Sequence, residues 1–180
     1  PSIGGAYMIV PWMNFVGTKY GGFPPAVATM MIGLIPFFAI LLMDKGDNKQ
    51  KMVDFLAFLA MGVTASYSFA NGHAAFRVLY GHPKRPMFAE GIAITFVGFI
   101  GLWMAWWFLS AAIYQLGNRK ESGWYLMLIG GAFAMFAGFA TGVVRYATVD
   151  YYLNGFLGLG TMVFALIPLF KERLLKEYTD

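Results

Sequence analysis

The chain has 180 residues, of which 59% are hydrophobic, 18% aromatic and only 12% charged, and its mean hydropathy is +0.61. Soluble domains carry about 25% charged residues, so this chain has too few charges to cover a surface in water. The composition therefore excludes a soluble globular domain and indicates an integral membrane protein. The chain has no cysteine, which excludes disulfides and cysteine-ligated metal or iron–sulfur sites.

The first 23 residues differ from the rest of the chain. Residues 7–16 are apolar, but this stretch is too short to cross a bilayer and is interrupted by Pro11. It also lacks the basic region that precedes the apolar part of a secretory signal. We expect residues 1–23 to form an interfacial or re-entrant segment on the outer face of the membrane.

Five charge-free stretches of 20 to 28 residues follow, separated by clusters of charged residues: 24–43, 55–76, 91–118, 122–144 and 151–170. A helix needs about 20 apolar residues to cross ~30 Å of hydrocarbon. The sequence therefore predicts an all-α, polytopic membrane protein with five transmembrane helices in a tight bundle. Their predicted bounds, within a transmembrane domain over 24–176, are about 24–43, 53–79, 87–116, 123–146 and 151–170. Residues 171–180 are expected to form a tail.

The distribution of Lys and Arg predicts the orientation. Eight of the thirteen basic residues lie in loop 44–54, loop 117–123 and the tail, and five lie on the other side. Because cytoplasmic loops carry the excess of Lys and Arg, we expect a multi-pass protein of the cell membrane with the N-terminus outside and the C-terminus in the cytoplasm. The same rule accounts for the net charge of +4, so no nucleic-acid partner is expected.

The second half of the predicted helix 53–79 is polar. His73 and Arg77 are four residues apart, so they share one face of the helix. Further charged residues fall at the same outer level, and together they form a predicted polar cluster: Asn71, His73, Arg77, Glu90, Arg145 and Asp150. Polar groups in a membrane normally face protein or water. The polar half of the helix indicates either the wall of a polar cavity or proton path that opens outward, or contacts between helices. The charged residues indicate either a site for a small anion or a quinone headgroup, or contacts that tie helix ends together.

His73 is the one candidate cofactor ligand. A haem held by two imidazoles needs two histidines that face each other, and the second histidine, His82, falls in a loop. His73 would ligate a haem only together with a methionine or a partner subunit; otherwise it is an interfacial residue that bonds to a neighbour. We predict no catalytic residues and no metal site. If the protein has a cofactor, we expect a haem or a quinone that it shares with a partner subunit.

Small residues recur at intervals of four in two predicted helices, and they are predicted helix-packing positions: Gly62, Ser66, Gly130, Ala134, Gly138 and Gly142. In lipid, small residues on one stripe let two backbones approach closely. We expect a neighbouring helix to pack backbone to backbone near Gly138. Asp54, at the start of the predicted helix 53–79, is expected to cap that helix, since a carboxylate complements a helix N-terminus.

Aromatic residues also follow the predicted spans. Tyr151 falls at an outer end and Trp124 at an inner end, as expected for the two interfacial belts of a membrane protein. Trp103, Trp106 and Trp107 begin well inside the helix 87–116. They indicate either contact with a partner subunit, a lipid or a quinone tail, or a thick aromatic girdle on the lipid face.

Two short motifs carry a family resemblance: Phe-Ala-Glu-Gly at 88–91 and Gly-Val-Val-Arg-Tyr at 142–146. They resemble an uncharacterised family of small polytopic membrane proteins in archaea and bacteria. The resemblance implies a polytopic helical fold. It implies no activity, cofactor or site residue.

The sequence contains no catalytic motif and no ionisable residue near the middle of a predicted span, where pumps and ion-coupled carriers place one. We therefore expect an accessory, non-catalytic integral-membrane subunit of a larger respiratory or electron-transfer complex. Its expected partners are other integral membrane subunits and structural lipids. Two alternatives stay open: a small transporter or channel that uses the polar half of helix 53–79, and a haem-bearing electron-transfer subunit that uses His73.

Overall fold

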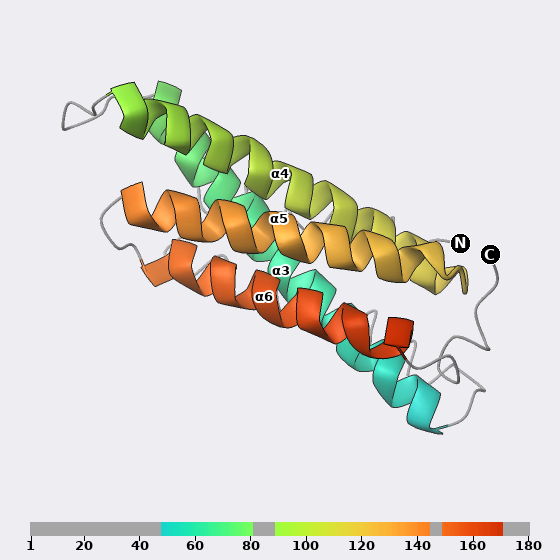
Figure 1. Cartoon of the computed structure of the whole chain (residues 1–180). Coiled ribbons are helices and arrows are strands. Elements are labelled where there is room, and N and C mark those ends of the chain that lie inside the picture. The colour runs from blue at the N-terminus through green and yellow to red at the C-terminus, as the bar shows by residue number, and fades with distance from the viewer. Residues whose placement is uncertain (1–47, 81–88, 145–148, 171–180) are drawn as a thin grey trace, which may run out of the picture.

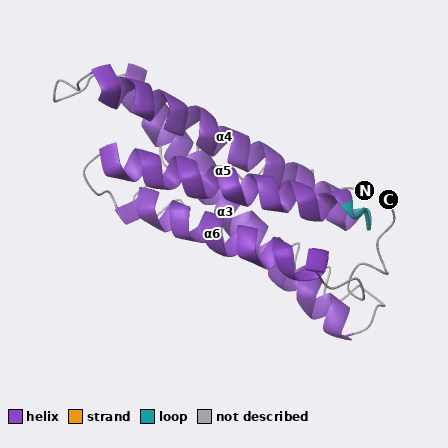
Figure 2. Ribbon diagram, in the orientation of Figure 1, coloured by secondary structure: helices purple, strands orange, loops and turns teal. Residues whose placement is uncertain are grey.

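A computed structural model describes residues 48–80, 89–144 and 149–170. Apart from one short turn, these residues form four α-helices: α3 (Asn48–Tyr80), α4 (Ala89–Gly117), α5 (Ser122–Val144) and α6 (Val149–Phe170), as Figure 2 shows. Each helix contains a stretch of 22 to 25 residues that is long and apolar enough to cross a membrane. The described part is thus all-α and consistent with a multi-pass membrane protein. The predicted helix 24–43, segment 1–23 and tail 171–180 lie outside it.

The helix ends differ from the predicted ones, most of all in α3. This helix begins at Asn48, five residues before the predicted start at 53, and includes the charged residues Lys49 and Lys51. Lys is a good helix former, so the helix continues past the last apolar residue. Its 33 residues correspond to about 50 Å, longer than the ~30 Å hydrocarbon core. The charge-free stretch marks the apolar part of α3 and not the length of the helix.

Helices that follow one another in the chain pack against one another, and α3 also packs against α6. In Figure 1, α4, α5 and α6 lie next to one another, and α3 crosses behind them and contacts both α4 and α6. The turn between α4 and α5 covers four residues, and its backbone is closed by hydrogen bonds from Arg119 N to Leu116 O (3.0 Å) and from Lys120 N to Gln115 O (3.0 Å). Arg119 has a φ of 59°, the left-handed conformation that commonly ends a helix.

Glycines bring α5 and α6 into close contact. A Cβ added to Gly138 would lie 2.6 Å from the backbone N of Gly155, and one added to Gly131 would lie 3.0 Å from the backbone O of Gly158. These distances leave no room for side chains, so the two backbones meet directly at the glycines. Close packing of this kind is what associates helices in lipid, where no hydrophobic effect drives them together.

The predicted stripe of small residues does not face one neighbour. Gly138 lies against α6, and a Cβ on Gly142 would meet the ring of Tyr152 at 3.3 Å, but a Cβ on Gly130 would meet Leu109 of α4 at 2.7 Å. The reason is the helical repeat of 3.6 residues, because positions four apart rotate steadily around the helix. Gly131, seven residues before Gly138, shares the contact with α6 instead.

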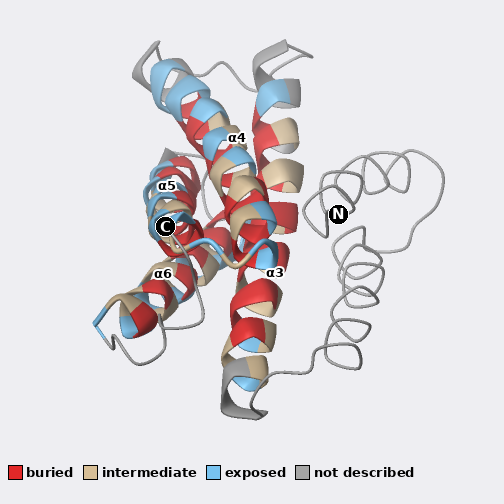
Figure 3. Cartoon of the chain, turned by 90° about the vertical axis from the view of Figure 1, so that its right-hand side faces the viewer, coloured by how far each residue is buried: buried red, intermediate tan, exposed pale blue. Residues whose placement is uncertain are grey.

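Burial separates α3 from the other helices. As Figure 3 illustrates, α5 and α6 expose at least one residue in every turn, whereas no residue of α3 between Ala57 and His73 is exposed. Two residues that the sequence placed in interfacial belts lie in the core: Trp124 is 0% and Tyr151 3% exposed. Their large apolar rings are buried among helices, which a sequence position near a span end does not reveal.

Gly138→Leu tests the contact between α5 and α6. The added side chain would push α6 away, and overpacking of this kind costs ~1–3 kcal/mol. We expect a lower thermal midpoint of the protein in detergent. The matched control is Gly160→Leu on α6, because a Cβ on Gly160 meets nothing within 4 Å. Equal midpoints for both variants would show that the glycine contact does not stabilise the bundle. A substitution of the neighbouring Phe139 would not serve as a control, because the Phe139 ring itself lies against Gly155 of α6.

Candidate functional site

A line of polar side chains joins α3 to α6 inside the bundle. Its members, here called the polar seam, are Thr64, Ser68 and Asn71 of α3 and Tyr151, Asn154 and Thr161 of α6. On α3 the spacing of four and three residues places them on one face. All six are at least 92% buried, with exposures between 0% and 8%. The seam is the main group of buried polar side chains that the structure brings together.

Asn154 lies at the centre of the seam and is fully buried. Its Nδ2 donates to Ser68 Oγ (3.2 Å) and to the backbone O of Ala134 in α5 (3.4 Å), and its Oδ1 accepts from Asn71 Nδ2 (3.2 Å). One amide therefore bonds to α3 and α5 from its position on α6. The contact with Ala134 is possible because the glycines beside it bring the α5 and α6 backbones together.

Asn71 extends the seam toward the start of α6. Its Nδ2 also donates to the backbone O of Asp150 (3.1 Å), and its own backbone O accepts from the hydroxyl of Tyr151 (3.4 Å). This pair of bonds fixes the first turn of α6 against α3.

Two threonines continue the seam on the other side of Asn154. Thr64 Oγ1 and Thr161 Oγ1 are 2.7 Å apart and share a hydrogen bond. Thr64 Oγ1 also lies 3.3 Å from the backbone O of Leu157, and Thr161 Oγ1 lies 3.4 Å from that of Ala60. The two hydroxyls have one proton each, so one hydroxyl donates to the other, and the hydroxyl that accepts donates its own proton to the backbone carbonyl of the opposite helix.

The chemistry of the seam is that of neutral donors and acceptors. Amides and aliphatic hydroxyls do not titrate near neutral pH and are weak nucleophiles without an adjacent base. They bond to one another and to backbone carbonyls. The arrangement can therefore hold helices at a fixed rotation and depth, as interhelical hydrogen bonds do in membranes.

The structure brings together only part of the predicted polar cluster. Asn71 and Asp150 meet, but through the backbone O of Asp150, whose side chain is exposed. His73 is half-buried on α3. The side chains of Arg77, Glu90 and Arg145 lie outside the described part of the chain, so the predicted charge network stays a prediction.

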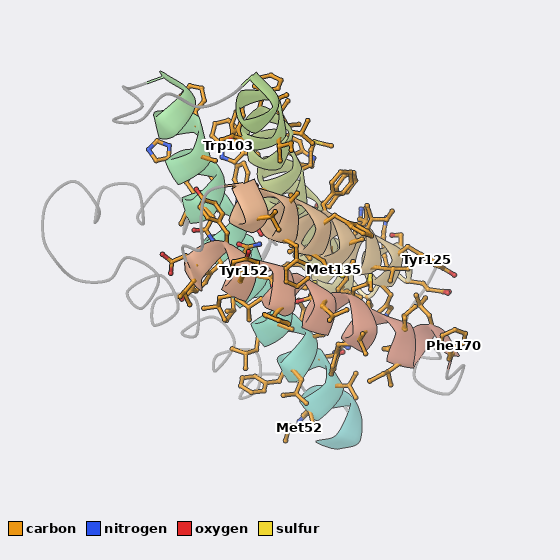
Figure 4. All side chains as sticks on the ribbon, turned by 60° about the vertical axis from the view of Figure 1, so that its left-hand side comes forward. Met52, Trp103, Tyr125, Met135, Tyr152 and Phe170 are labelled. Carbon is orange, nitrogen blue, oxygen red and sulfur yellow. The ribbon has the colours of Figure 1, made fainter. Side chains whose placement is uncertain are left out.

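The contact between α3 and α4 is aromatic. The ring of Phe69 lies between Trp103 (centroids 6.1 Å apart, stacked) and Trp106 (5.0 Å, edge-on), and Phe99 packs against Trp103 at 4.7 Å. Figure 4 shows Trp103 between α3 and α4, far from Met52 at the start of α3. Within the described helices, the indole nitrogens of Trp103 and Trp106 are buried without a hydrogen-bond partner. Trp107 is 57% exposed, so the three tryptophans do not share one role.

Asp54 does not cap α3. It lies in the second turn of the helix, because α3 begins at Asn48, and its carboxylate forms an ion pair with the guanidinium of Arg119. Asp54 is almost completely buried. The ion pair attaches the turn between α4 and α5 to α3 at the end of the bundle opposite the polar seam.

The sequence interpretation missed Asn154 and Thr161. Both lie in the charge-free stretch 151–170, which the sequence analysis treats only as a membrane span. An amide in lipid needs hydrogen-bond partners, so Asn154 by itself predicts a hydrogen bond between helices. The same rule predicts hydrogen-bond partners for Asn71, but it does not identify the helix that supplies them.

In the described residues, no group of three or more His, Asp and Glu is close enough to hold a metal ion.

Asn154→Ala tests the seam. Interhelical hydrogen bonds in membranes contribute about 0.6 kcal/mol each on average, so the loss of three should lower the free energy of unfolding by about 2 kcal/mol. The measurement is an unfolding titration in detergent micelles. Asn118→Ala is the matched control, because Asn118 is exposed and its side chain donates to Tyr114 O within its own turn. Its effect should stay below ~0.5 kcal/mol. Similar losses for both variants would contradict a stabilising seam.

Comparisons with protein-family models, with curated proteins and with solved structures find no match to this chain. The resemblance of residues 88–91 and 142–146 to a family of small membrane proteins therefore adds no activity and no site residue.

Proposed function

We propose that this chain is a non-catalytic integral-membrane subunit that packs against other membrane subunits in a larger electron-transfer complex. The observation that carries the proposal is the polar seam. Its neutral side chains form hydrogen bonds between α3, α5 and α6. The polar groups that could line a transport path are therefore engaged in contacts between helices. A rigid bundle is what a scaffold subunit requires.

The other half of the bundle supports the same role. Beyond Thr64 the core is an apolar cluster centred on Met61, Leu109, Ile113, Trp124 and Met127. A path for a polar solute would have to continue through this cluster. The seam and the cluster together favour a packed bundle over the alternative of a small transporter or channel.

The electron-transfer part of the proposal is supported by the aromatic cluster on α3 and α4. Rings of Phe76, Phe99, Trp103, Phe69 and Trp106 lie within 6.2 Å of a neighbour, measured between centroids. Flat conjugated molecules such as quinones and haems pack well on aromatic rings. A cofactor held by a partner subunit, with lipids around it, would fit against this side of the bundle.

The proposal includes the finer topology that the sequence predicts. A fifth helix over 24–43 precedes α3, with segment 1–23 at the outer surface. The ion pair between Asp54 and Arg119 supports one element of this topology, because it places the start of α3 and the turn between α4 and α5 at the same end. Both regions belong to the Lys- and Arg-rich side, which we assign to the cytoplasm of a cell-membrane protein.

Single cysteines test the topology in this cysteine-free chain. An impermeant thiol reagent added from outside should label Lys19→Cys and Pro83→Cys and should leave Asn48→Cys unlabelled until the membrane is opened. Labelling of Lys19→Cys and Asn48→Cys from the same face would contradict a helix over 24–43. The reversed pattern at all three positions would contradict the orientation alone.

Purification in mild detergent tests the function. We expect the chain to co-purify in fixed stoichiometry with larger redox subunits. A chain that purifies alone and conducts a solute in vesicles would favour the transporter. For the haem alternative, the test is His73→Gln: we expect assembly and any haem spectrum to be unchanged, and loss of a Soret band that the isolated parent chain retains would assign His73 as a ligand.

A further inference from the structure

We infer that α3 is the central helix of the complete bundle and that residues 24–43 pack against it in antiparallel orientation, along a face made by Leu59, Gly62, Ser66, Ala70 and His73. These residues, here called the third face, follow one another at spacings of three and four, which places them on one side of the helix. The inference rests on the five-helix topology proposed above and goes beyond it by assigning a contact surface.

The described neighbours of α3 cover its two other faces. Phe69, Gly72 and Phe76 face α4, where they meet Trp103 and Phe99. Thr64, Ser68 and Asn71 face α6 through the polar seam. With 3.6 residues per turn, Ser66 and Ala70 point away from both groups.

The third face is nevertheless covered. Ser66 is 3% exposed, Gly62 is buried, and Leu59, Ala70 and His73 are half-buried. On α5 and α6, by contrast, the side that faces away from the bundle carries exposed apolar residues such as Phe136 (68%) and Phe156 (62%). A helix without an exposed side over four turns needs neighbours on every side.

The length of the connection identifies the occupant. The predicted helix 24–43 ends four residues before α3 begins at Asn48. Helices joined by so short a connection pack as antiparallel neighbours. α4 and α6 already occupy two faces of α3, which leaves the third face. Gly62 and Ser66 are small residues of the kind that let two helices approach closely in lipid.

The connection also predicts a register. Ser66 lies 18 residues beyond Asn48, and the residue 18 before 43 is Pro25. Ser66 should therefore lie level with Pro25 and next to the turn that follows it, formed by Ala26, Val27, Ala28 and Thr29. By the same count, Leu59 should lie beside Ile32.

Disulfide formation between introduced cysteines tests this contact, because a disulfide forms only where two Cα atoms come within about 4.4–6.8 Å. Ser66→Cys is combined with a cysteine at each of positions 26 to 29 in the full-length chain, and the membranes are oxidised. The free thiols are then counted by mass-tagged maleimide after denaturation. We expect at least one of the four pairs to lose both thiols within one chain. Leu59→Cys with Ile32→Cys provides an independent pair on the same face.

Ala65→Cys is the matched control, since Ala65 lies beside Ser66 in the chain but belongs to the apolar core cluster shared with α4. We expect it to stay reduced with all four partners. Equal cross-linking at Ala65 and Ser66, or no cross-link from Ser66 and Leu59, would overturn the inference. A disulfide-linked dimer of the single variant Ser66→Cys would also overturn it and assign the third face to a second copy. If Lys19→Cys and Asn48→Cys still label from opposite sides, the five-helix topology stands and only the contact surface is wrong.

Discussion

The buried amide of Asn154 is the group on which the arrangement of the described helices depends. In hydrocarbon no water is available, and an amide without partners costs several kcal/mol. Asn154 avoids this cost by bonding to Ser68 and Asn71 on α3 and to the Ala134 carbonyl on α5. All three bonds are made only if α6 has one rotation and one depth relative to both neighbours. The amide thus specifies the packing as well as stabilising it.

The glycines of α5 and α6 make this bonding possible. A side-chain amide reaches a carbonyl of a neighbouring helix only when the two backbones are close, and Gly131, Gly138, Gly155 and Gly158 remove the side chains that would separate them. Packing and hydrogen bonding therefore depend on each other. Removal of the close contact should weaken the bonds of Asn154, and the two effects would not be additive.

The two ends of the bundle are held by different interactions. One half contains the neutral polar seam and an aromatic contact between α3 and α4, and the other half contains an apolar cluster closed by the ion pair of Asp54 with Arg119. Arg119 adopts a positive φ to make the turn at this end, a conformation that costs a non-glycine residue roughly 1–2 kcal/mol. In the proposed complex, a bundle held at both ends would offer a rigid surface to partner subunits. This rigidity is the property on which the proposed role as a membrane subunit rests.

The sequence by itself determined the class of protein and the positions of the four described spans, because insertion into lipid depends on the local run of apolar residues and on the charges that end it. It also pointed to Asn71 and Gly138 as contact residues, since a buried amide and a glycine in lipid have few other uses. Only the tertiary structure decided that Asn154 and Thr161 are the partners of α3, that Gly131 and not Gly130 faces α6, and that Asp54 pairs with Arg119. Each of these contacts depends on how a helix is rotated about its axis, and rotation is set by all neighbours together, which no spacing within a single helix encodes.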